Sequence, residues 1–507
     1  MAGSSRERPP ESGTARRVED RRSPLERLLG VVTEVKAGEG VTALFLTLNV
    51  FLLLTAYYVI KPVREGLIIA MKSGAEYKSY LSAAIAVALL FAVPAYARVA
   101  SRVPKNKLVA GVTLFFASHL TLFWLLSKVP AAEQHLGLVF YVWVGIFNMM
   151  VVAQFWAFAN DLYTPDQGKR LFALIGIGAS AGAALGAYVT SFLKDTLGLG
   201  IYELLLVSAG LLVGCALLTQ LTHARERAAA ERAKHVLREE REGLESGAGK
   251  AEASGAGGSG GAFGLVFRHK YLLLIACFSL VFSFVNTNGE YILSVLVKAK
   301  AKEAALAAGV VGDAAIRKFT KDYGTTFYGD FFLWVNVIGV ALQSFAVSRI
   351  VKLGGLRLAL FILPVIALFD SIALLTLPAA LALSELAVLR PGKIAENATD
   401  YSINNTVRNM LWLPTSTEMK YKAKQAVDTF FVRMGDVASA ALVFIGSDRL
   451  HWSVRSFAVV NAGLVAVWLV LARNIVRENL ALSNLAVPGE PPAEGSKAKA
   501  AGTADAS

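Results

Sequence analysis

Apolar segments of about twenty residues or more alternate with shorter polar segments along most of this 507-residue chain. Because a helix needs about 20 apolar residues to cross the hydrocarbon core of a bilayer, the pattern predicts about twelve transmembrane helices. The predicted fold class is therefore an all-α polytopic membrane protein. The expected spans lie near residues 42–68, 79–98, 108–127, 136–160, 171–193, 200–222, 271–297, 327–349, 357–377, 380–411, 426–446 and 454–476.

Polar segments at both ends and in the middle divide these spans into two groups of six. The middle segment is first charged and then rich in Gly and Ser, which is typical of a flexible linker. Two groups of six spans joined by a cytoplasmic linker predict a major-facilitator-like bundle with its substrate near the bilayer midplane. The expected parts are a disordered basic cytoplasmic tail (1–40), an N-terminal six-helix bundle (41–222), a cytoplasmic linker (223–262), a C-terminal six-helix bundle (263–478) and a disordered tail (479–507).

Composition agrees with a membrane protein, because 55% of the residues are hydrophobic and 18% are charged. Soluble domains carry about 25% charged residues, so a soluble multi-domain enzyme is excluded. The net charge of +13 comes from Lys and Arg clustered in loops and tails. The positive-inside rule explains that clustering without a nucleic-acid partner, and it predicts that both termini are cytoplasmic. We expect a multi-pass protein of the cell (inner) membrane.

The sequence offers no catalytic triad, metal cluster or nucleotide-hydrolysing motif, so neither an enzyme nor a cofactor is expected. The two cysteines, Cys215 and Cys277, lie in separate apolar runs and predict neither a disulfide nor a metal site. A glycine-rich stretch in the fifth span is also not a dinucleotide fingerprint. Its residues Gly178, Gly182 and Gly186 are four apart, which predicts close packing between two helices in a membrane.

Ionisable residues within the spans are the candidate functional groups, because each costs at least about 2.5–3.5 kcal/mol to insert. In the first span Tyr57, Lys61 and Arg64 fall at i, i+4 and i+7, on one helical face. The two cations could extend to the outer interface. Since apolar residues resume after Glu65, the pattern favours a buried site that faces a cavity.

The tenth span contains a polar stripe formed by Glu396, Asp400, Asn404 and Arg408, which are spaced by four residues, with Lys393 beside it. Such a stripe cannot face lipid. It could be a polar network that only holds the bundle together, but it favours a water-filled transport pathway.

Glu290 interrupts the apolar seventh span. It is either a gating partner for a cation or a carboxylate close to the outer surface, and the pattern favours gating. If Lys61, Arg64 and Arg408 meet at one cavity, they would suit phosphates or carboxylates, which Arg binds in bidentate fashion.

Three segments carry a resemblance to a known family. They are IKPVREGL (60–67), FWAFANDLYTPDQGKRLFALIGIGA (155–179) and DYSINNTVRNMLWLP followed by KYKAKQAVD (400–428). They resemble the nucleotide transporter (ATP/ADP translocase) family of plastids and intracellular bacteria. The resemblance extends over residues 41–447 and is most specific in the second half.

The resemblance implies transport of a nucleoside di- or triphosphate, with ATP/ADP exchange by alternating access as the expected activity. It also assigns roles to individual residues. The family's first-span cations correspond to Lys61 and Arg64, its seventh-span glutamate to Glu290 and its tenth-span lysine to Arg408. Its fourth-span glutamate would fall near Val144, where this chain has no acid. Nucleotide or other phosphorylated-anion transport is therefore implied more directly than strict ATP/ADP specificity.

Two other functions fit the same spans. One is proton-coupled transport of another organic anion, with Glu396, Asp400 or Glu290 as the proton carrier. The other is a membrane scaffold that transports nothing and binds partners through its linker. In that case charge reversals within the spans would leave function unchanged.

Overall fold

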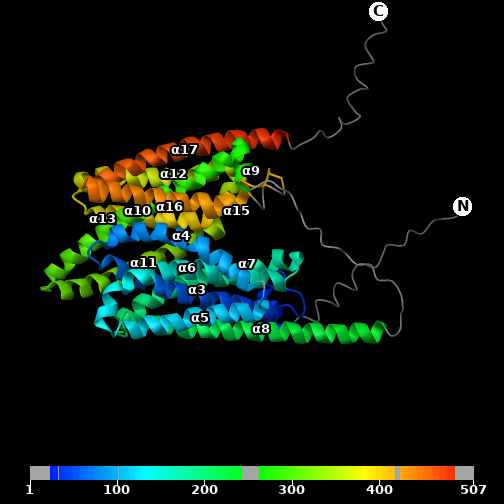
Figure 1. Cartoon of the computed structure of the whole chain (residues 1–507). Helices are drawn as coiled ribbons and strands as arrows, with labels where there is room; N and C mark the ends of the chain where they lie inside the picture. Colours follow the sequence, from blue (N-terminus) through cyan, green and yellow to red (C-terminus); the bar gives the residue numbers. More distant parts are fainter. Residues whose placement is uncertain are drawn as a thin grey trace, which may run out of the picture. The chain divides into compact units, whose positions relative to one another are not determined.

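The computed structural model describes residues 23–31, 33–100, 102–241, 262–416, 419 and 423–485, and the regular structure of these residues is helical. The chain forms two compact units, which we call the N-terminal unit and the C-terminal unit. The N-terminal unit covers Met1–Gly255 and Ser294–Ile338, and the C-terminal unit covers Ala256–Leu293 and Gly339–Ser507. Figure 1 labels the helices of both units.

The N-terminal unit is a bundle of long helices. It contains α2 (Pro24–Leu29), α3 (Gly40–Ile69), α4 (Gly74–Ala100), α5 (Lys105–Leu126), α6 (Pro130–Leu162), α7 (Pro165–Asp195) and α8 (Glu203–Arg241), together with parts of α10 (Lys270–Ala307) and α11 (Asp313–Ala341).

The C-terminal unit begins with α9 (Ala262–Arg268) and the first part of α10, and four of its helical stretches are π-helical. The remaining elements are η1 (Leu342–Ala346), α12 (Val347–Leu381), α13 (Glu385–Thr399), η2 (Asp400–Asn404), α14 (Asn405–Met410), α15 (Lys424–Ala426), η4 (Val427–Phe431), α16 (Val432–Val443), η5 (Phe444–Arg449) and α17 (Val454–Leu485).

Helices cover the spans that the hydropathy pattern predicts, which confirms the all-α polytopic fold. In the described ranges, nine helical stretches are long and apolar enough to cross a membrane. One of them, Asp313–Leu381, has 69 residues, more than one crossing of about 20 residues needs. Neither α4 nor the segment from α13 to α14 is among the nine. The tenth span also starts later than expected, because α12 ends at Leu381 and α13 begins at Glu385.

Three helices extend into segments that the sequence assigns to tails or linker. Where a disordered tail is predicted over 1–40, α2 forms with Ser23 as its N-cap and a capping box to Glu26. At the predicted linker, α8 continues without a break to Arg241. At the C-terminal end, α17 continues to Leu485. The Gly- and Ser-rich part of the linker and the C-terminal tail lie outside the described residues, so the predicted division into tails, bundles and linker stays a prediction.

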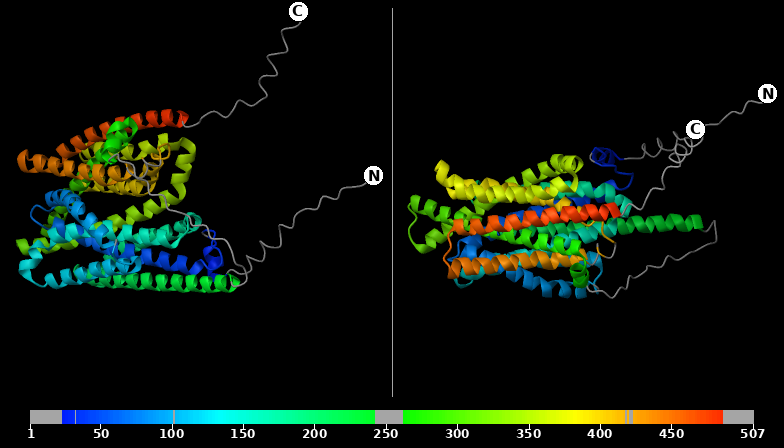
Figure 2. Two further views of the ribbon diagram at one scale, coloured as in Figure 1. Left: turned by 45° about the vertical axis from the view of Figure 1, so that its right-hand side comes forward. Right: turned by 90° about the horizontal axis from the view of Figure 1, so that it is seen from above.

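Close packing of α7 on α3 follows from the three glycines that the sequence singles out. A Cβ at Gly178, Gly182 or Gly186 would collide with the backbone of α3, at Thr47, Phe51 and Thr55 respectively. The predicted close helix packing is therefore confirmed. Figures 1 and 2 show α3 beside α7, and α5 beside α8, within the N-terminal unit.

The C-terminal unit packs α12 against α17 and α13, around a core that includes Phe278, Leu363 and Trp468. Here too a glycine allows close approach, because a Cβ at Gly435 of α16 would collide with the backbone of α10 at Leu280. Among the described residues the π-helical turns all belong to this unit. Such turns are rare and occur frequently at functional sites.

Candidate functional site

Four ionisable residues meet in the N-terminal unit. We call Lys61, Arg64 and Glu65 of α3 and Lys78 of α4 the cationic cluster. The Arg64 guanidinium is hydrogen-bonded to the Glu65 carboxylate, and the Lys78 Nζ lies 2.9 Å from the other oxygen of Glu65. The Glu65 side chain is 1% exposed, and those of Arg64 and Lys78 are 13% and 7% exposed. Two cations of the cluster therefore share one buried carboxylate.

Aromatic rings surround Lys61, the first cation of the cluster. Its Nζ lies 3.8 Å from the ring centroid of Phe332 and 5.1 and 5.8 Å from those of Tyr58 and Tyr57. A cation held over ring faces gains about 0.5–2 kcal/mol from each good contact. The structure thus places Lys61 in a buried aromatic environment, and a cavity at this residue stays a prediction.

The other two cations of the cluster also contact rings. The Arg64 guanidinium lies 4.5 Å from the ring centroid of Tyr141 on α6. Lys78 lies 5.1 Å from the ring centroid of Tyr328 on α11 and donates a 3.1 Å hydrogen bond to Ser294. Helices α3, α4, α6, α10 and α11 therefore all contribute to the environment of this cluster.

A second group of ionisable residues meets in the C-terminal unit. We call Glu290 of α10, Asp370 of α12, and Lys393 and Glu396 of α13 the acidic cluster. The Lys393 Nζ lies 2.6 Å from Glu396 and 4.0 Å from Glu290. Asn397 donates a 3.1 Å hydrogen bond to Glu290. Lys393 is 1% exposed, so this cluster holds one deeply buried cation among three carboxyl groups.

The polar stripe of the tenth span is divided in the structure. Asn404 donates a 2.7 Å hydrogen bond to Asp400, while Glu396 contacts Lys393. Arg408 pairs with Asp428 at 2.7 Å, and about a quarter of its side chain is exposed. The π-helical turn η2 lies between Glu396 and Arg408, and its wider turn changes which side chains align.

The candidate residues thus fall into separate groups. Lys61 and Arg64 share the cationic cluster, and Glu290 belongs to the acidic cluster. The Asp400–Asn404 pair lies on η2, and Arg408 with Asp428 forms a further ion pair of the C-terminal unit.

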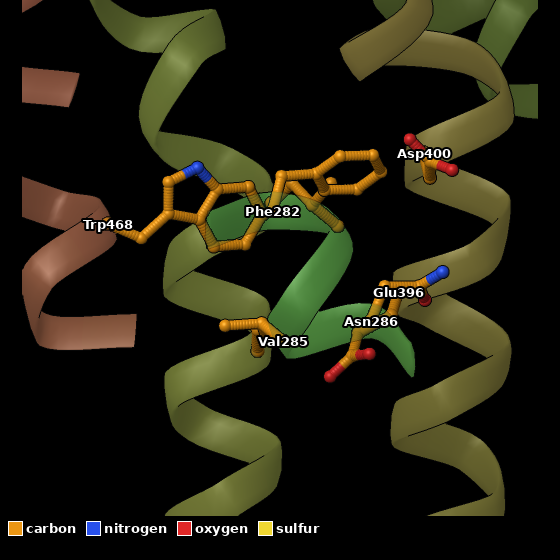
Figure 3. A pocket seen from close by; sticks show the side chains of 8 residues that line it. Phe282, Val285, Asn286, Glu396, Asp400 and Trp468 are labelled. Atoms are coloured by element: carbon orange, nitrogen blue, oxygen red, sulfur yellow. The ribbon is translucent and has the colours of Figure 1, made fainter. Parts of the chain in front are cut away.

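A small pocket in the C-terminal unit adjoins the acidic cluster. Figure 3 shows Glu396 and Asp400 on one wall and Trp468 toward the opposite wall. Polar side chains on one side and aromatic ones on the other can hold a ligand with both characters. The lining residues are Phe282, Val285, Asn286, Leu363, Ala367, Glu396, Asp400 and Trp468.

Four functional candidates escape sequence reasoning: Glu65, Lys78, Asp370 and Asp428. Asp370 had a usable signal, because it is an acid within the apolar segment FILPVIALFDSIALL. Lys78 lies directly before the predicted second span, so hydropathy assigns it to a loop. Asp428 gives no sequence signal as the partner of Arg408, because the two are 20 residues apart. In the described residues, no group of three or more His, Cys, Asp or Glu could hold a metal ion.

Solved structures with a similar fold are membrane transporters. The nucleoside transporter NupG matches with a TM-score of 0.54 at 13% identity, over 86% of this chain and 98% of that one. A D-xylose-proton symporter matches with a TM-score of 0.52 at 14% identity, over 85% of this chain and 96% of that one. This likeness shows that the chain is an all-helical membrane protein with a fold like that of these transporters.

The family is more specific than the fold. The model of the TLC ATP/ADP transporter family matches residues 129–479, so this chain belongs to that family and is a transporter, not an enzyme. This confirms the resemblance seen in the three sequence segments. It also removes the non-transporting scaffold from the possible functions.

Two curated relatives support the family assignment. ADP,ATP carrier protein 1 of Chlamydia pneumoniae is 24% identical over 523 aligned positions, covering 91% of this chain and 96% of the relative. ADP,ATP carrier protein 1 of Chlamydia trachomatis is 23% identical over 383 positions, covering 68% of this chain. In the second case the chain spans 66% of the relative, just under two thirds of its length.

Proposed function

We propose that this protein exchanges nucleoside di- and triphosphates across a membrane by alternating access, and that the cationic cluster binds their phosphate groups. The observation that carries the proposal is the charge of that cluster, in which Arg64 and Lys78 share the single carboxylate of Glu65 and Lys61 adds a third buried cation on α3. Burying excess positive charge is costly, and a polyanionic substrate would offset that cost. Arg64 can bind a phosphate through two parallel hydrogen bonds.

Nucleotides are the polyanions that the relatives suggest, since both are named ADP,ATP carrier proteins. The chain departs from the family pattern at Val144, which is buried on α6. Val144 lies one helical turn after Tyr141, the residue whose ring Arg64 covers. In this chain Glu65 supplies the carboxylate next to Arg64. Arg64 therefore has an acidic partner although position 144 carries no acid.

The polar residues of the C-terminal unit complete the proposal. Arg408 is proposed as a second phosphate-binding residue. It would release Asp428 and bind a phosphate group of the substrate in its place. Glu290, Asp400 and Asn404 are proposed to line the transport pathway. The loop charges support cytoplasmic termini, and we propose the cell (inner) membrane as the location, with 41–222 and 263–478 as the two bundles.

The test is uptake of labelled ATP by the purified full-length protein in proteoliposomes, with and without internal ADP. If the protein exchanges nucleotides, internal ADP should stimulate the uptake of labelled ATP. Arg64→Gln should lower the rate by about 10- to 100-fold, as expected when a charge-assisted hydrogen bond of about 1.5–3 kcal/mol is lost. The matched control is Lys107→Gln, an exposed cation on α5, which should behave like wild type. Equal rates in the two variants would refute phosphate binding by the cationic cluster.

Arg408 has a test of its own. Arg408→Ala should abolish exchange, and Arg408→Lys should keep part of it, because the charge remains and only the bidentate geometry is lost. If Arg408 only balances Asp428, the double variant Arg408→Ala, Asp428→Ala should recover wild-type exchange, because neither charge is then left without its partner. Full recovery would remove Arg408 from the binding site.

The second candidate function is proton-coupled transport of another organic anion, which the acidic cluster favours. It predicts uptake that needs an inward proton gradient and is independent of internal ADP. The same proteoliposomes separate the two functions when internal ADP and the pH gradient are varied independently.

A further inference from the structure

Asp370 occupies an unusual position on α12. Its side chain is 5% exposed, and its carboxyl group lies against Gly392 of α13 so closely that a Cβ on this glycine would collide with it. No described residue donates a hydrogen bond to the Asp370 carboxyl from a backbone or neutral side-chain group. A buried carboxyl without such donors cannot keep a negative charge cheaply.

The group that Asp370 does meet is another acid. Glu396 of α13 lies within hydrogen-bonding reach of Asp370, and Lys393 is the nearby cation. Lys393 is already engaged by Glu396 at 2.6 Å and by Glu290 of α10 at 4.0 Å. One cation therefore faces three carboxyl groups.

The other elements packed on α12 do not add a second cation at this point. From α17, Asn461 donates to Ser371, the neighbour of Asp370. From η2, Asp400 contributes a further acid on the pocket wall. From α14, Arg408 is held by Asp428. When two carboxyl groups share a buried site, they do not both ionise, and the pair keeps one proton.

The pocket lies directly beside this pair and has room for about one water molecule. Glu396 is both a member of the pair and a pocket-lining residue, with Asp400 next to it on the same wall (Figure 3). On the other wall, the Trp468 Nε1 is buried and has no hydrogen-bond acceptor among the described residues.

We propose that Asp370 and Glu396 form a proton-binding site, and that the proton crosses the membrane together with one of the exchanged nucleotides. The proton binds from the pocket side to the pair, whose two carboxyl groups then carry a single negative charge against Lys393. Release of the proton leaves Lys393 facing three carboxylates. The coupling part of this proposal rests on the proposed nucleotide exchange, whereas the shared proton rests on the geometry alone.

The shared proton is tested without any substrate. Infrared difference spectra of the purified full-length protein at neutral pH should show a protonated carboxyl band that Asp370→Asn removes. Glu396→Gln should remove the same band and provides a second variant if one folds poorly. The matched control is Asp313→Asn, which changes an exposed acid on α11 and should keep the band. If Asp370→Asn instead removes a carboxylate band, the pair is fully ionised and the proposal is overturned.

Coupling is tested in proteoliposomes that contain ADP and take up labelled ATP. With one proton per nucleotide, a pH gradient of one unit should change the final ATP accumulation by roughly tenfold, because one unit is a tenfold concentration ratio. The ratio of accumulation with and without the gradient should fall to one in Asp370→Asn and stay at the wild-type value in Asp313→Asn. An unchanged ratio in Asp370→Asn overturns the coupling.

The two proposals fail in different ways. If the wild-type protein transports no nucleotide but shows the band that Asp370→Asn removes, the proton site stands and the proposed function falls. If exchange occurs but the pH gradient does not change the final ATP accumulation by the wild-type protein, the proposed function stands and coupling at Asp370 is refuted.

Discussion

The two units carry buried ionisable clusters of opposite character. In the N-terminal unit, Arg64 and Lys78 pair with one carboxylate, that of Glu65, and Lys61 adds a buried cation on the same helix as Arg64. In the C-terminal unit, three carboxyl groups surround one cation, Lys393. Each buried cluster has an excess of one sign of charge, so a different group is needed to neutralise each of them. The excess of cations suits a polyanion, whereas the excess of carboxyl groups suits a proton.

The helices that carry the two clusters also differ. Lys61, Arg64 and Glu65 lie on α3, which the structure assigns as one α-helix through Pro62. The acidic cluster lies next to η2, and α12 contains a non-helical Gly355. Such π-helical turns and non-helical residues interrupt the regular hydrogen-bond ladder. The comparison therefore associates the regular helices with the cationic cluster and the interrupted ones with the acidic cluster.

The largest expected effect comes from removing one acid from each cluster. Glu65→Ala leaves Arg64 and Lys78 buried without their common partner and should lower the free energy of unfolding by about 3–5 kcal/mol. Glu396→Ala should cost clearly less, because Lys393 keeps Glu290 nearby. Thermal and denaturant unfolding of the two detergent-solubilised variants measures the difference.

Glu303→Ala is the matched control, because this exposed glutamate pairs with Lys300 at the surface and exposed pairs contribute about 0–1 kcal/mol. Equal losses in Glu65→Ala and Glu396→Ala would show that the two clusters balance charge in the same way, which would contradict the comparison.

Much of the fold, but only part of the two clusters, can be predicted from the sequence. Hydropathy places the spans because the length of an apolar helix is a local property. The spacing of Gly178, Gly182 and Gly186 predicts close helix packing for the same reason. Within α3, the i, i+4 spacing places Lys61 near Tyr57, whose ring centroid lies 5.8 Å from the Lys61 Nζ.

Contacts between distant segments are what sequence reasoning lacks here. Lys78 reaches Glu65 from another helix, and Asp370 reaches Glu396 from α12. The expected continuity of the tenth-span stripe assumes an unbroken α-helix. Since η2 interrupts that helix, Arg408 pairs with Asp428 and not with Asp400, the nearest acid of the stripe.

The next prediction concerns a packing feature that the two units share. Both units use a glycine where two helices approach closely, Gly182 on α7 and Gly435 on α16. Leucine at either position should destabilise the protein by about 1–3 kcal/mol, because the added atoms force neighbouring helices apart. Gly176→Leu is the control, since a Cβ at this α7 position meets nothing within 4 Å.

Unfolding midpoints of the three glycine variants would show whether the units differ in packing as well as in charge. Similar losses of stability in Gly182→Leu and Gly435→Leu would show that the two units differ in their charged clusters and not in helix packing. A large loss for Gly176→Leu would point to helix propensity or insertion in place of packing.

The smallest effect concerns an ion pair outside both clusters and sets the scale for them. Glu39, directly before α3, pairs with Arg170 at 2.9 Å. Burial acts to raise the pKa of Glu39, but hydrogen bonds from Arg170, the Lys36 backbone and Gln167 outweigh it, so the pKa is lowered overall. A lowered pKa in the folded state stabilises the protein above the ordinary pKa of glutamate, and this stability is lost as the pH falls through the folded value.

Glu39→Gln should therefore lower the free energy of unfolding at neutral pH by about 1 kcal/mol, the upper end of the range for ion pairs near the surface. The difference from wild type should shrink as the pH falls below the ordinary pKa of glutamate, and it should vanish only below the lowered folded pKa, where glutamate is protonated in both states. Unfolding of the two proteins as a function of pH measures this, and a difference that persists unchanged in acid would show that Glu39 acts through packing and not through its charge.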